Sequence, residues 1–191
     1  MITWEDLNMG FKLDDMIGKY KDFARGYLFY VKVDTGTVAG VSLLPDHPYL
    51  VSSAKLPAQT IEAIPVPWQG QEYKLGGTST FEAFDITFKS DVAQELRRNF
   101  LVWMNAIHNP VSNEHGLPGN YFGQVDLTQL NGQGGPVMSY SLVNAFPTAI
   151  GEVSLDYSTK EISTFNVTFT YQYHVMEGIS GGVPATPVSL S

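Results

Sequence analysis

Residues 144–175 read NAFPTAIGEVSLDYSTKEISTFNVTFTYQYHV, and the second half of this stretch decides the fold. Two sets of side chains alternate there: Phe165, Val167, Phe169, Tyr171, Tyr173 and Val175 form one set, and Thr164, Asn166, Thr168, Thr170, Gln172 and His174 form the other. Successive side chains of a β-strand point to opposite faces of its sheet, so the alternation predicts one long, half-buried strand. Such a strand spans roughly 35–40 Å at ~3.3 Å per residue, well beyond the common length of about five or six residues.

The polar side of this strand carries almost no charge, which is unusual for a face that only meets bulk solvent. Thr164, Asn166, Thr168, Thr170 and Gln172 therefore form a candidate interface face. We expect residues 151–157 and the turn Ser158–Glu161 to supply the antiparallel partner strand. A long exposed strand edge invites aggregation unless another chain pairs with it, which favours a protein that assembles.

The composition indicates a globular chain of 191 residues, long enough for one domain with a substantial core. Hydrophobic residues make up 43% and charged residues only 16%, below the usual quarter, which leaves surface suited to protein contacts. There is no cysteine, so disulfides, zinc–thiolate sites and thiol nucleophiles are excluded. The N-terminal residues lack the cationic segment of a secretory signal, and no apolar window approaches the ~18 residues of a membrane span.

The net charge of −8 is unevenly distributed. From residue 99 onward Lys160 is the only basic residue, against the acidic residues Glu114, Asp126, Glu152, Asp156, Glu161 and Glu177. Because this part of the chain has no basic stripe to neutralise phosphates, tight nucleic-acid binding is not expected. An acidic surface can still surround a nucleic acid and let it slide.

Further strands and two helices are expected around the opening stretch. One face of an N-terminal helix carries Leu13, Met16, Ile17, Tyr20 and Phe23. Strands are predicted at residues 27–33, 49–56, 60–67, 72–75, 80–89, 121–127 and 136–145, and Pro65 and Pro67 restrict the strand at 60–67 to an edge or a short length. Asp91 and Gln94 form a capping-box pattern before a helix that ends at Asn109-Pro110 and whose apolar face carries Val92, Leu96, Phe100, Trp103, Met104 and Ile107.

The predicted fold class is mainly β within the α+β group. Two packed antiparallel sheets would form a small barrel or sandwich, flanked by one main helix and an N-terminal helix. Residues 1–177 are expected to form a single β-domain, with residues 1–26 as a helical arm. Residues 34–48 and 111–120 are predicted to be loops, and residues 178–191 a flexible or extended tail, because they are rich in glycine, proline and serine.

The sequence lacks the residue patterns of an enzyme. Ser180 lies in a G-x-S-x-G sequence, but no acid or histidine follows it in the chain, as a nucleophile elbow requires. His108, Glu114 and His115 make a weak set of metal ligands, with no fourth ligand nearby in the sequence. No phosphate-binding loop or dinucleotide fingerprint occurs. We therefore expect no catalytic residue, metal or cofactor, and we interpret His174 as a surface or interface histidine.

From residue 23 onward the chain resembles the tail tube proteins of contractile-tailed, T-even-like bacteriophages. The shared motifs are Phe23-Ala24-Arg25, Leu56-Pro57-Ala58, Ile64-Pro65-Val66, the set Gly77, Thr80, Phe81 and Phe84, and the helix residues Phe100 and Trp103. The opening stretch adds Phe146-Pro147-Thr148, Gly151-Glu152, Leu155-Asp156-Tyr157, Glu161-Ile162, Phe165, Val167 and Thr168. Each motif alone is weak, but their shared order and spacing over residues 20–175 make the resemblance specific.

The resemblance implies a structural protein of the virion tail, assembled in the host cytoplasm. Six copies would close into a ring, and rings would stack into the tube inside a contractile sheath, through which the genome is ejected. In such a ring the uncharged face of Thr164, Asn166, Thr168, Thr170 and Gln172 would line either the channel or a subunit contact. The implied partners are further copies of the chain, the sheath protein, the baseplate and tail terminator proteins, and the tape-measure protein and DNA in the lumen. The DNA would be held without sequence-specific binding, and no membrane partner is expected.

Other interpretations stay open at this point. Residues 34–48, residues 131–136 and the tail after Glu177 are long for the family, which is compatible with a baseplate tube initiator or an injection-system tube protein. A monomeric ligand-binding β-domain would show the same alternation. An enzyme is the third alternative, and it would require a histidine or carboxylate with a strongly shifted pKa in a cleft.

Overall fold

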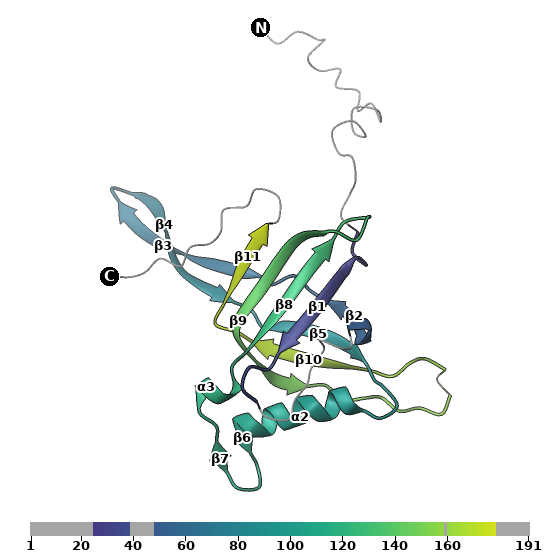
Figure 1. The fold of residues 1–191 in the computed structure, drawn as a ribbon. Coiled ribbons are helices and arrows are strands. Elements are labelled where there is room, and N and C mark those ends of the chain that lie inside the picture. Colours follow the sequence, from purple (N-terminus) through teal and green to yellow (C-terminus); the bar gives the residue numbers. More distant parts are fainter. Residues whose placement is uncertain (1–24, 39–47, 159, 179–191) are drawn as a thin grey trace, which may run out of the picture.

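The computed structural model describes residues 25–38, 48–158 and 160–178. They form two main β-sheets that share one strand, two separate two-stranded pairs and one long helix (Figure 1). The longer strands in this part are β1 (Phe29–Asp34), β2 (Val51–Ala54), β3 (Gln59–Trp68), β4 (Gln71–Phe81), β5 (Phe84–Lys89), β8 (Gly123–Leu130), β9 (Pro136–Ile150), β10 (Thr164–Thr170) and β11 (Tyr173–Gly178). The other elements are the 3-10 helix η1 (Pro48–Leu50), the helices α2 (Glu95–Ile107) and α3 (Pro118–Tyr121), and the two-residue strands β6 (His108–Asn109) and β7 (Glu114–His115). The predicted N-terminal helix, the centre of the predicted 34–48 loop and nearly all of the predicted tail lie outside the described residues.

Strand β9 joins the two sheets. The strand order is β1-β8-β9-β10-β5-β2, with β11 also paired to β9, and all neighbours are antiparallel. The first part of β9 pairs with β8 and β11, whereas its last residues pair with β10. Between these parts Asn144 has a positive φ of 54° and is skipped in the register with β8, where Val143 pairs with Gln124 and Ala145 with Gly123. This β-bulge bends β9, so its two parts belong to different sheets.

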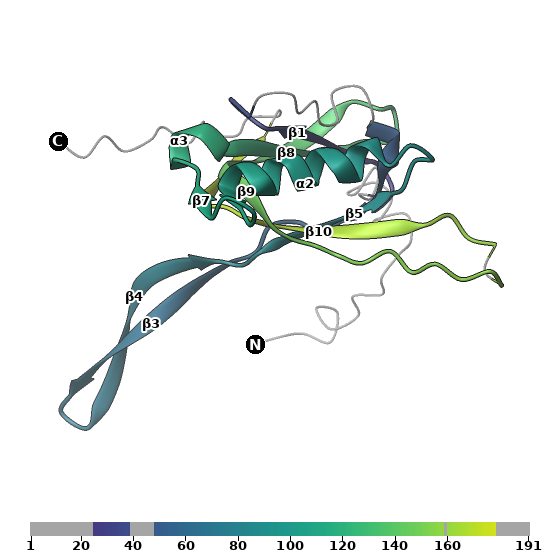
Figure 2. The same cartoon turned by 90° about the horizontal axis from the view of Figure 1, so that it is seen from below.

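The two sheets form an open sandwich. Among the described residues, β1 pairs only with β8 and β2 only with β5, so the strand order does not close into a barrel. The predicted fold class is confirmed: the structure is mainly β, with packed antiparallel sheets and one main helix beside them (Figures 1 and 2).

The prediction of a single long strand ending at Val175 is wrong. The chain breaks at Tyr171 and Gln172 into β10 and β11, which pair with different parts of β9. Because β9 bends at its bulge, one straight strand could not follow both parts. The Asn144 side-chain amide donates a hydrogen bond of 3.0 Å to Gln172 Oε1, which links the two bends. The expected partner at residues 151–157 is also wrong: that segment has no strand, and the partner of β10 is the end of β9.

The alternation nevertheless identified the buried side of β10. Phe165, Val167, Phe169 and Tyr171 are all buried, and the three apolar residues of β5, Phe84, Ile86 and Phe88, are buried beside them. Helix α2 covers this side with Leu96, Phe100 and Trp103. The ring centroid of Phe100 lies 5.9 Å from that of Phe169 and 5.2 Å from that of Phe88. The aromatic part of the core is therefore a layer between α2 and the β5–β10 pair, and the same core continues into the buried aliphatic residues of β1, β8 and β9. The alternation fails after the break, since Tyr173 is exposed.

Helix α2 begins later than its capping-box pattern predicts. Its first residue is Glu95, and its N-cap residue is Gln94, which has a φ of 51° and no side-chain capping hydrogen bond. Asp91 instead heads a separate turn, in which its carbonyl accepts from the Gln94 amide at 3.1 Å and its side chain accepts from the Glu95 amide at 3.2 Å. Val92 lies in that turn and is fully exposed, so its assignment to the apolar face is wrong. The end of the helix at Ile107 agrees with the Asn109-Pro110 signal.

The remaining predicted strands are present, but their lengths differ from the predicted ones. Strands β1, β2, β5, β8 and β9 correspond to the predicted ranges 27–33, 49–56, 80–89, 121–127 and 136–145. Residues 80 and 81 belong instead to β4, and β9 extends five residues beyond the predicted end at Ala145. The predicted loop at 111–120 contains β7, which pairs with β6, and the start of α3. These two elements are too short to produce a periodic apolar pattern, so the sequence did not predict them.

Gly123 allows β8 to pass close to helix α2. A Cβ atom at this position would collide with the Asp34 carbonyl oxygen and lie 2.9 Å from the Trp103 ring. We expect Gly123→Ala to lower the free energy of unfolding by about 1–3 kcal/mol, because neither the strand nor the buried ring can move away without strain. Urea unfolding measures the change. Gly119→Ala is the matched control: a Cβ there meets nothing within 4 Å, so its stability should equal that of the wild type or exceed it slightly.

Candidate assembly surfaces

Strands β3 and β4 form a two-stranded ribbon that projects from the body of the molecule (Figure 2). They pair only with each other among the described residues, and nearly every residue along them is exposed. Gln69 and Gly70 connect them with positive φ angles of 45° and 83°, as in the two-residue turns that suit a twisted hairpin. The strands predicted at 60–67 and 72–75 are confirmed, and Pro65 and Pro67 lie on an edge strand as predicted, although β3 is long, with ten residues.

One face of the ribbon carries an exposed apolar stripe. Ile64 lies opposite Leu75, Val66 lies opposite Tyr73, and Trp68 lies next to the turn on the same face. We call Ile64, Val66, Trp68, Tyr73 and Leu75 the apolar stripe; Trp68 is 69% and Tyr73 66% exposed. The opposite face carries Ala63, Pro65, Pro67, Glu72 and Lys74. An isolated hairpin is marginally stable in water, and an exposed apolar row marks a contact surface, so the stripe is suited to cover by another chain.

Gly77 of β4 leaves space for the side chain of Ile64, the stripe residue nearest the body. A Cβ at this position would lie 2.9 Å from Ile64 Cγ1 and 2.8 Å from the Glu62 carbonyl oxygen. The register between β3 and β4 shifts at this point, between Ile61 and Ala63. This gives a physical reason for the glycine in the predicted motif of Gly77, Thr80 and Phe81.

An aromatic cluster holds the root of the ribbon against the body. The Phe81 ring at the end of β4 lies 5.9 Å from the Tyr171 ring and 5.4 Å, edge-on, from the His174 ring. Tyr140 of β9 completes the cluster, 6.3 Å from His174. Neither the Tyr171 hydroxyl nor His174 Nδ1 has a hydrogen-bond partner, and both atoms are buried. His174 is half-buried, and within the subunit its ring packs at the root of the ribbon. A role of this residue at an interface stays a prediction.

Burial shifts the pKa of both polar members of the cluster. It lowers the pKa of His174 below 6.5, because the protonated ring would lose hydration among aromatic side chains. Burial, and secondarily the nearby Glu82 carboxylate, raises the pKa of the Tyr171 hydroxyl above 10.0. Both groups are therefore neutral near pH 7, which suits a packing role.

We expect the protein to lose stability as the pH falls below about 6.5, in part through His174. The unfolded chain takes up the proton at the ordinary histidine pKa, whereas the folded chain binds it only at a lower pH, so the proton favours unfolding in between. Urea unfolding at about pH 7.5 and about pH 5.5 measures the difference. In His174→Phe the loss should be smaller than in the wild type. An equal loss in both proteins would assign the pH dependence to other groups.

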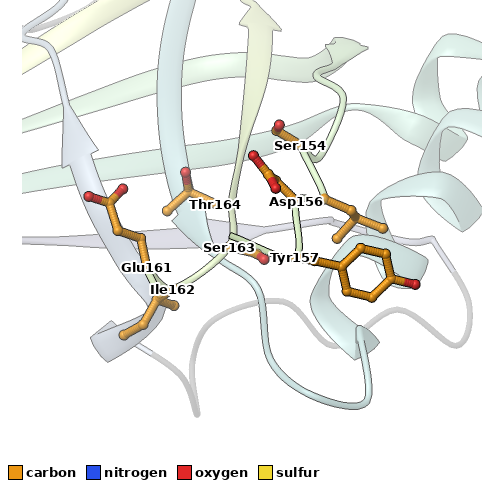
Figure 3. A pocket seen from close by; sticks show the side chains of 8 residues that line it. Ser154, Asp156, Tyr157, Glu161, Ile162, Ser163 and Thr164 are labelled. Carbon is orange, nitrogen blue, oxygen red and sulfur yellow. The ribbon is translucent and has the colours of Figure 1, made fainter. Parts of the chain in front are cut away.

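The loop between β9 and β10 forms a second exposed surface, on the side opposite the ribbon (Figure 2). A shallow groove in it is lined by Ser154, Leu155, Asp156, Tyr157, Glu161, Ile162, Ser163 and Thr164 (Figure 3). Leu155, Tyr157 and Ile162 are exposed, and Asp156 and Glu161 add negative charge. The Gly151 carbonyl accepts a hydrogen bond of 2.7 Å from Arg97, and the Gly151 amide donates one to Asn166, so the base of the loop is fixed.

The predicted polar face of β10 forms a hydrogen-bonded network. Asp85 Oδ1 on β5 accepts from Thr168 Oγ1 at 2.6 Å and from the Asn166 side-chain amide at 3.4 Å. Thr170 and Thr148 of β9 are in contact at 3.5 Å between their hydroxyl oxygens. The structure thus brings together Thr164, Asn166, Thr168 and Thr170 on one strand, whereas Gln172 lies at the bend beside Asn144.

Asp85 was missed as a member of this face. The alternation of Asp85, Thr87 and Lys89 along β5 was visible in the sequence, but only the register with β10 places Asp85 opposite Thr168.

The motif residues are distributed over the whole molecule and do not converge on one pocket. They lie between β2 and β3 (Leu56, Pro57), on the ribbon (Pro65, Gly77, Thr80, Phe81), in the core (Trp103, Pro147, Phe165) and in the β9–β10 loop (Gly151, Asp156). Trp103 donates a hydrogen bond of 2.8 Å to the Tyr121 carbonyl, which joins α2 to α3. The pattern is that of a scaffold with extended contact surfaces.

The described residues hold no group of three or more histidine, cysteine or acidic side chains placed to bind a metal ion. His108 and His115 lie opposite each other on β6 and β7 with stacked rings, and the Ser112 hydroxyl donates a hydrogen bond to the Glu114 carboxylate. Ser180 lies outside the described residues. No helix in the described ranges is long and apolar enough to cross a membrane.

Sequence comparison identifies the family. The profile of the family described as "Phage tail tube protein" matches residues 33–177, which is most of the chain. The chain belongs to the phage tail tube protein family. It is 29% identical over 167 residues to the tail tube protein gp19 of Enterobacteria phage T4, covering 84% of this chain and 98% of that protein. It is also 29% identical over 132 residues to the tail tube protein of Serratia phage KSP90, covering 69% of this chain and 73% of that one.

Solved structures share the fold of this tail tube protein. A chain from the sheath/tube terminator of the PVC extracellular contractile injection system has a TM-score of 0.63 at 19% identity, covering 82% of this chain and 98% of that one. A chain of the sheath–tube complex of the same system has a TM-score of 0.59 at 20% identity, covering 88% and 99%. A chain of the six-fold symmetrised baseplate of the anti-feeding prophage has a TM-score of 0.62 at 14% identity, covering 83% and 98%.

These findings confirm the family resemblance predicted from the motifs. The protein is a structural component of the tail of contractile-tailed phage virions, and its fold is shared with components of contractile injection systems. The family is one of structural proteins, whose function depends on contact surfaces.

Proposed function

We propose that six copies of this chain close into a ring and that rings stack into the tail tube through which the genome is ejected. The observation that carries the proposal is the apolar stripe, which is exposed on a ribbon standing away from the body. A stripe of this kind meeting a different surface of another copy makes a heterologous contact, and such contacts produce closed rings or open stacks. A chain with the same fold occurs in a six-fold symmetrised baseplate, which supports six copies per ring.

The polar face of β10 is suited to line the channel of this ring. Its hydroxyl and amide groups lie on the side of the sheet opposite the aromatic core, and Asp85 adds a carboxylate that accepts hydrogen bonds from two of them. A hydroxyl-rich, weakly acidic wall repels phosphates and lets DNA slide without sequence-specific contacts. The tape-measure protein would share this lumen.

The β9–β10 loop is suited to contact other tail proteins. Its exposed apolar side chains are combined with the carboxylates of Asp156 and Glu161, which favours a partner that has both apolar and basic side chains. The sheath, baseplate and terminator proteins are the partners we propose for the outside and the ends of the tube. The fold shared with chains of sheath–tube, baseplate and terminator assemblies supports these assignments.

Negative-stain microscopy of the purified chain, together with its mass in solution, tests the proposal. We expect rings with six-fold symmetry and stacked tubes at high protein concentration. Monomers alone, at high concentration and at low and high salt, would contradict it.

A further inference from the structure

The register of the ribbon fixes which backbone groups point outward. Directly opposed residues in an antiparallel pair alternate between hydrogen-bonded and non-hydrogen-bonded positions. Pro65 lies opposite Lys74 and Pro67 opposite Glu72, and proline has no N–H to donate. These two pairs, and the Ala63–Gly76 pair in the same phase, are therefore the non-hydrogen-bonded ones. Their backbone N–H and C=O groups point away from the partner strand.

The two outer edges of the ribbon consequently differ. The outer edge of β3 lacks two N–H donors, at Pro65 and Pro67, so a further strand cannot pair with it along this part. The outer edge of β4 keeps the N–H and C=O groups of Glu72, Lys74 and Gly76, and no strand pairs with it among the described residues. Only the β4 edge is open to strand addition.

We propose that the outer edge of β4 pairs with an extended strand of a second copy of this chain, and that Pro65 and Pro67 confine this pairing to one side of the ribbon. The inference rests on the proposed assembly of copies and specifies how the ribbon makes its contact. A second copy is the occupant because the proposed assembly joins copies of this chain through the apolar stripe, and Tyr73 and Leu75 of that stripe lie on β4 itself. A strand added there continues the ladder, and its side chains on the stripe face pack beside those of Tyr73 and Leu75. One open edge also gives the contact a direction, as a heterologous interface requires.

Lys74→Pro tests the open edge. It removes the outward N–H of Lys74, and the ribbon already accepts a proline at the residue opposite. We expect the subunit to stay folded and the protein concentration needed for assembly to rise by at least about tenfold, through the lost hydrogen bond and the clash of the ring with an added strand. Lys74→Thr is the matched control, which removes the charge but keeps the N–H. It should assemble like the wild type.

Hydrogen exchange of the wild-type protein gives a second measurement that needs no variant. The amides of Glu72, Lys74 and Gly76 should exchange rapidly in unassembled subunits and become protected in assemblies. If they exchange rapidly in both states, or if Lys74→Pro assembles as the wild type does, the inference is overturned. If Lys74→Thr impairs assembly as strongly as Lys74→Pro, the lysine side chain makes the contact, and the inference is again overturned.

The role of the two prolines is tested by restoring the missing N–H donors on the outer edge of β3. The double variant Pro65→Thr and Pro67→Thr restores both donors on the outer edge of β3, and we expect disordered aggregates in place of regular assemblies. Regular assemblies of wild-type appearance would show that the prolines do not confine the pairing. A wild-type protein that stays monomeric would contradict the proposed function, and the inference with it. Wild-type tubes with exposed β4 amides would contradict the inference alone.

Discussion

Phe169→Asp is expected to leave no folded protein. Phe169 is fully buried, with ring centroids 5.9 Å from Phe100 and 6.2 Å from Trp103. Losing the ring costs about 3–5 kcal/mol, and burying a carboxylate without a partner adds several kcal/mol more. A domain of this kind is stable by only about 5–15 kcal/mol in total, so the two losses together exceed or approach the whole stability. Circular dichroism and the yield of soluble protein measure the result.

Thr170→Asp is the control for this variant. Thr170 is the next residue on the same strand, but it is exposed on the polar face. The substitution introduces the same carboxylate, and we expect the protein to fold with a thermal midpoint close to that of the wild type. A soluble Phe169→Asp protein with a cooperative unfolding transition would show that the assignment of the two faces of β10 is wrong.

The faces of β10 could be predicted from the sequence, but the course of the chain could not. Period-two alternation reports which side chains share a face, and it placed Phe165, Val167 and Phe169 in the core. It does not report which strand lies alongside. The division into β10 and β11 follows from the bend of β9 at Asn144, a single residue with positive φ that no apolar pattern reveals. Strand pairing over long separations in the sequence is a property of the whole fold.

The contact surfaces were predictable to different degrees. The hairpin signal of the ribbon lies in its turn, and the prolines identified it as an edge, but its length and its exposed stripe required the register between Ile64 and Leu75. The role of His174 was not predictable, because its neighbours Phe81 and Tyr140 come from distant parts of the chain. The motif residues were recognised by order and spacing alone. The structure gives some of them a physical reason, such as the space that Gly77 leaves for Ile64.

The double variant Trp68→Ser and Tyr73→Ser is expected to abolish assembly and leave the subunit folded. Both side chains lie on the apolar stripe and are mostly exposed, so the body loses no packing when they are removed. Large aromatic side chains at the centre of an interface typically contribute about 2 kcal/mol or more each, so losing both weakens each contact by at least about 100-fold. Sedimentation and microscopy measure assembly, and thermal unfolding measures the fold.

The opposite face of the same ribbon supplies the control for that variant. In the double variant Glu72→Thr and Lys74→Thr, two exposed side chains on the same strand are replaced, but the apolar stripe is retained. The salt bridge of 3.8 Å that these two residues form is exposed on both sides and contributes little to stability. We expect this protein to assemble, since the stripe and the backbone groups of β4 are unchanged. If the Trp68 and Tyr73 variant assembles equally well, the apolar stripe is not the assembly surface.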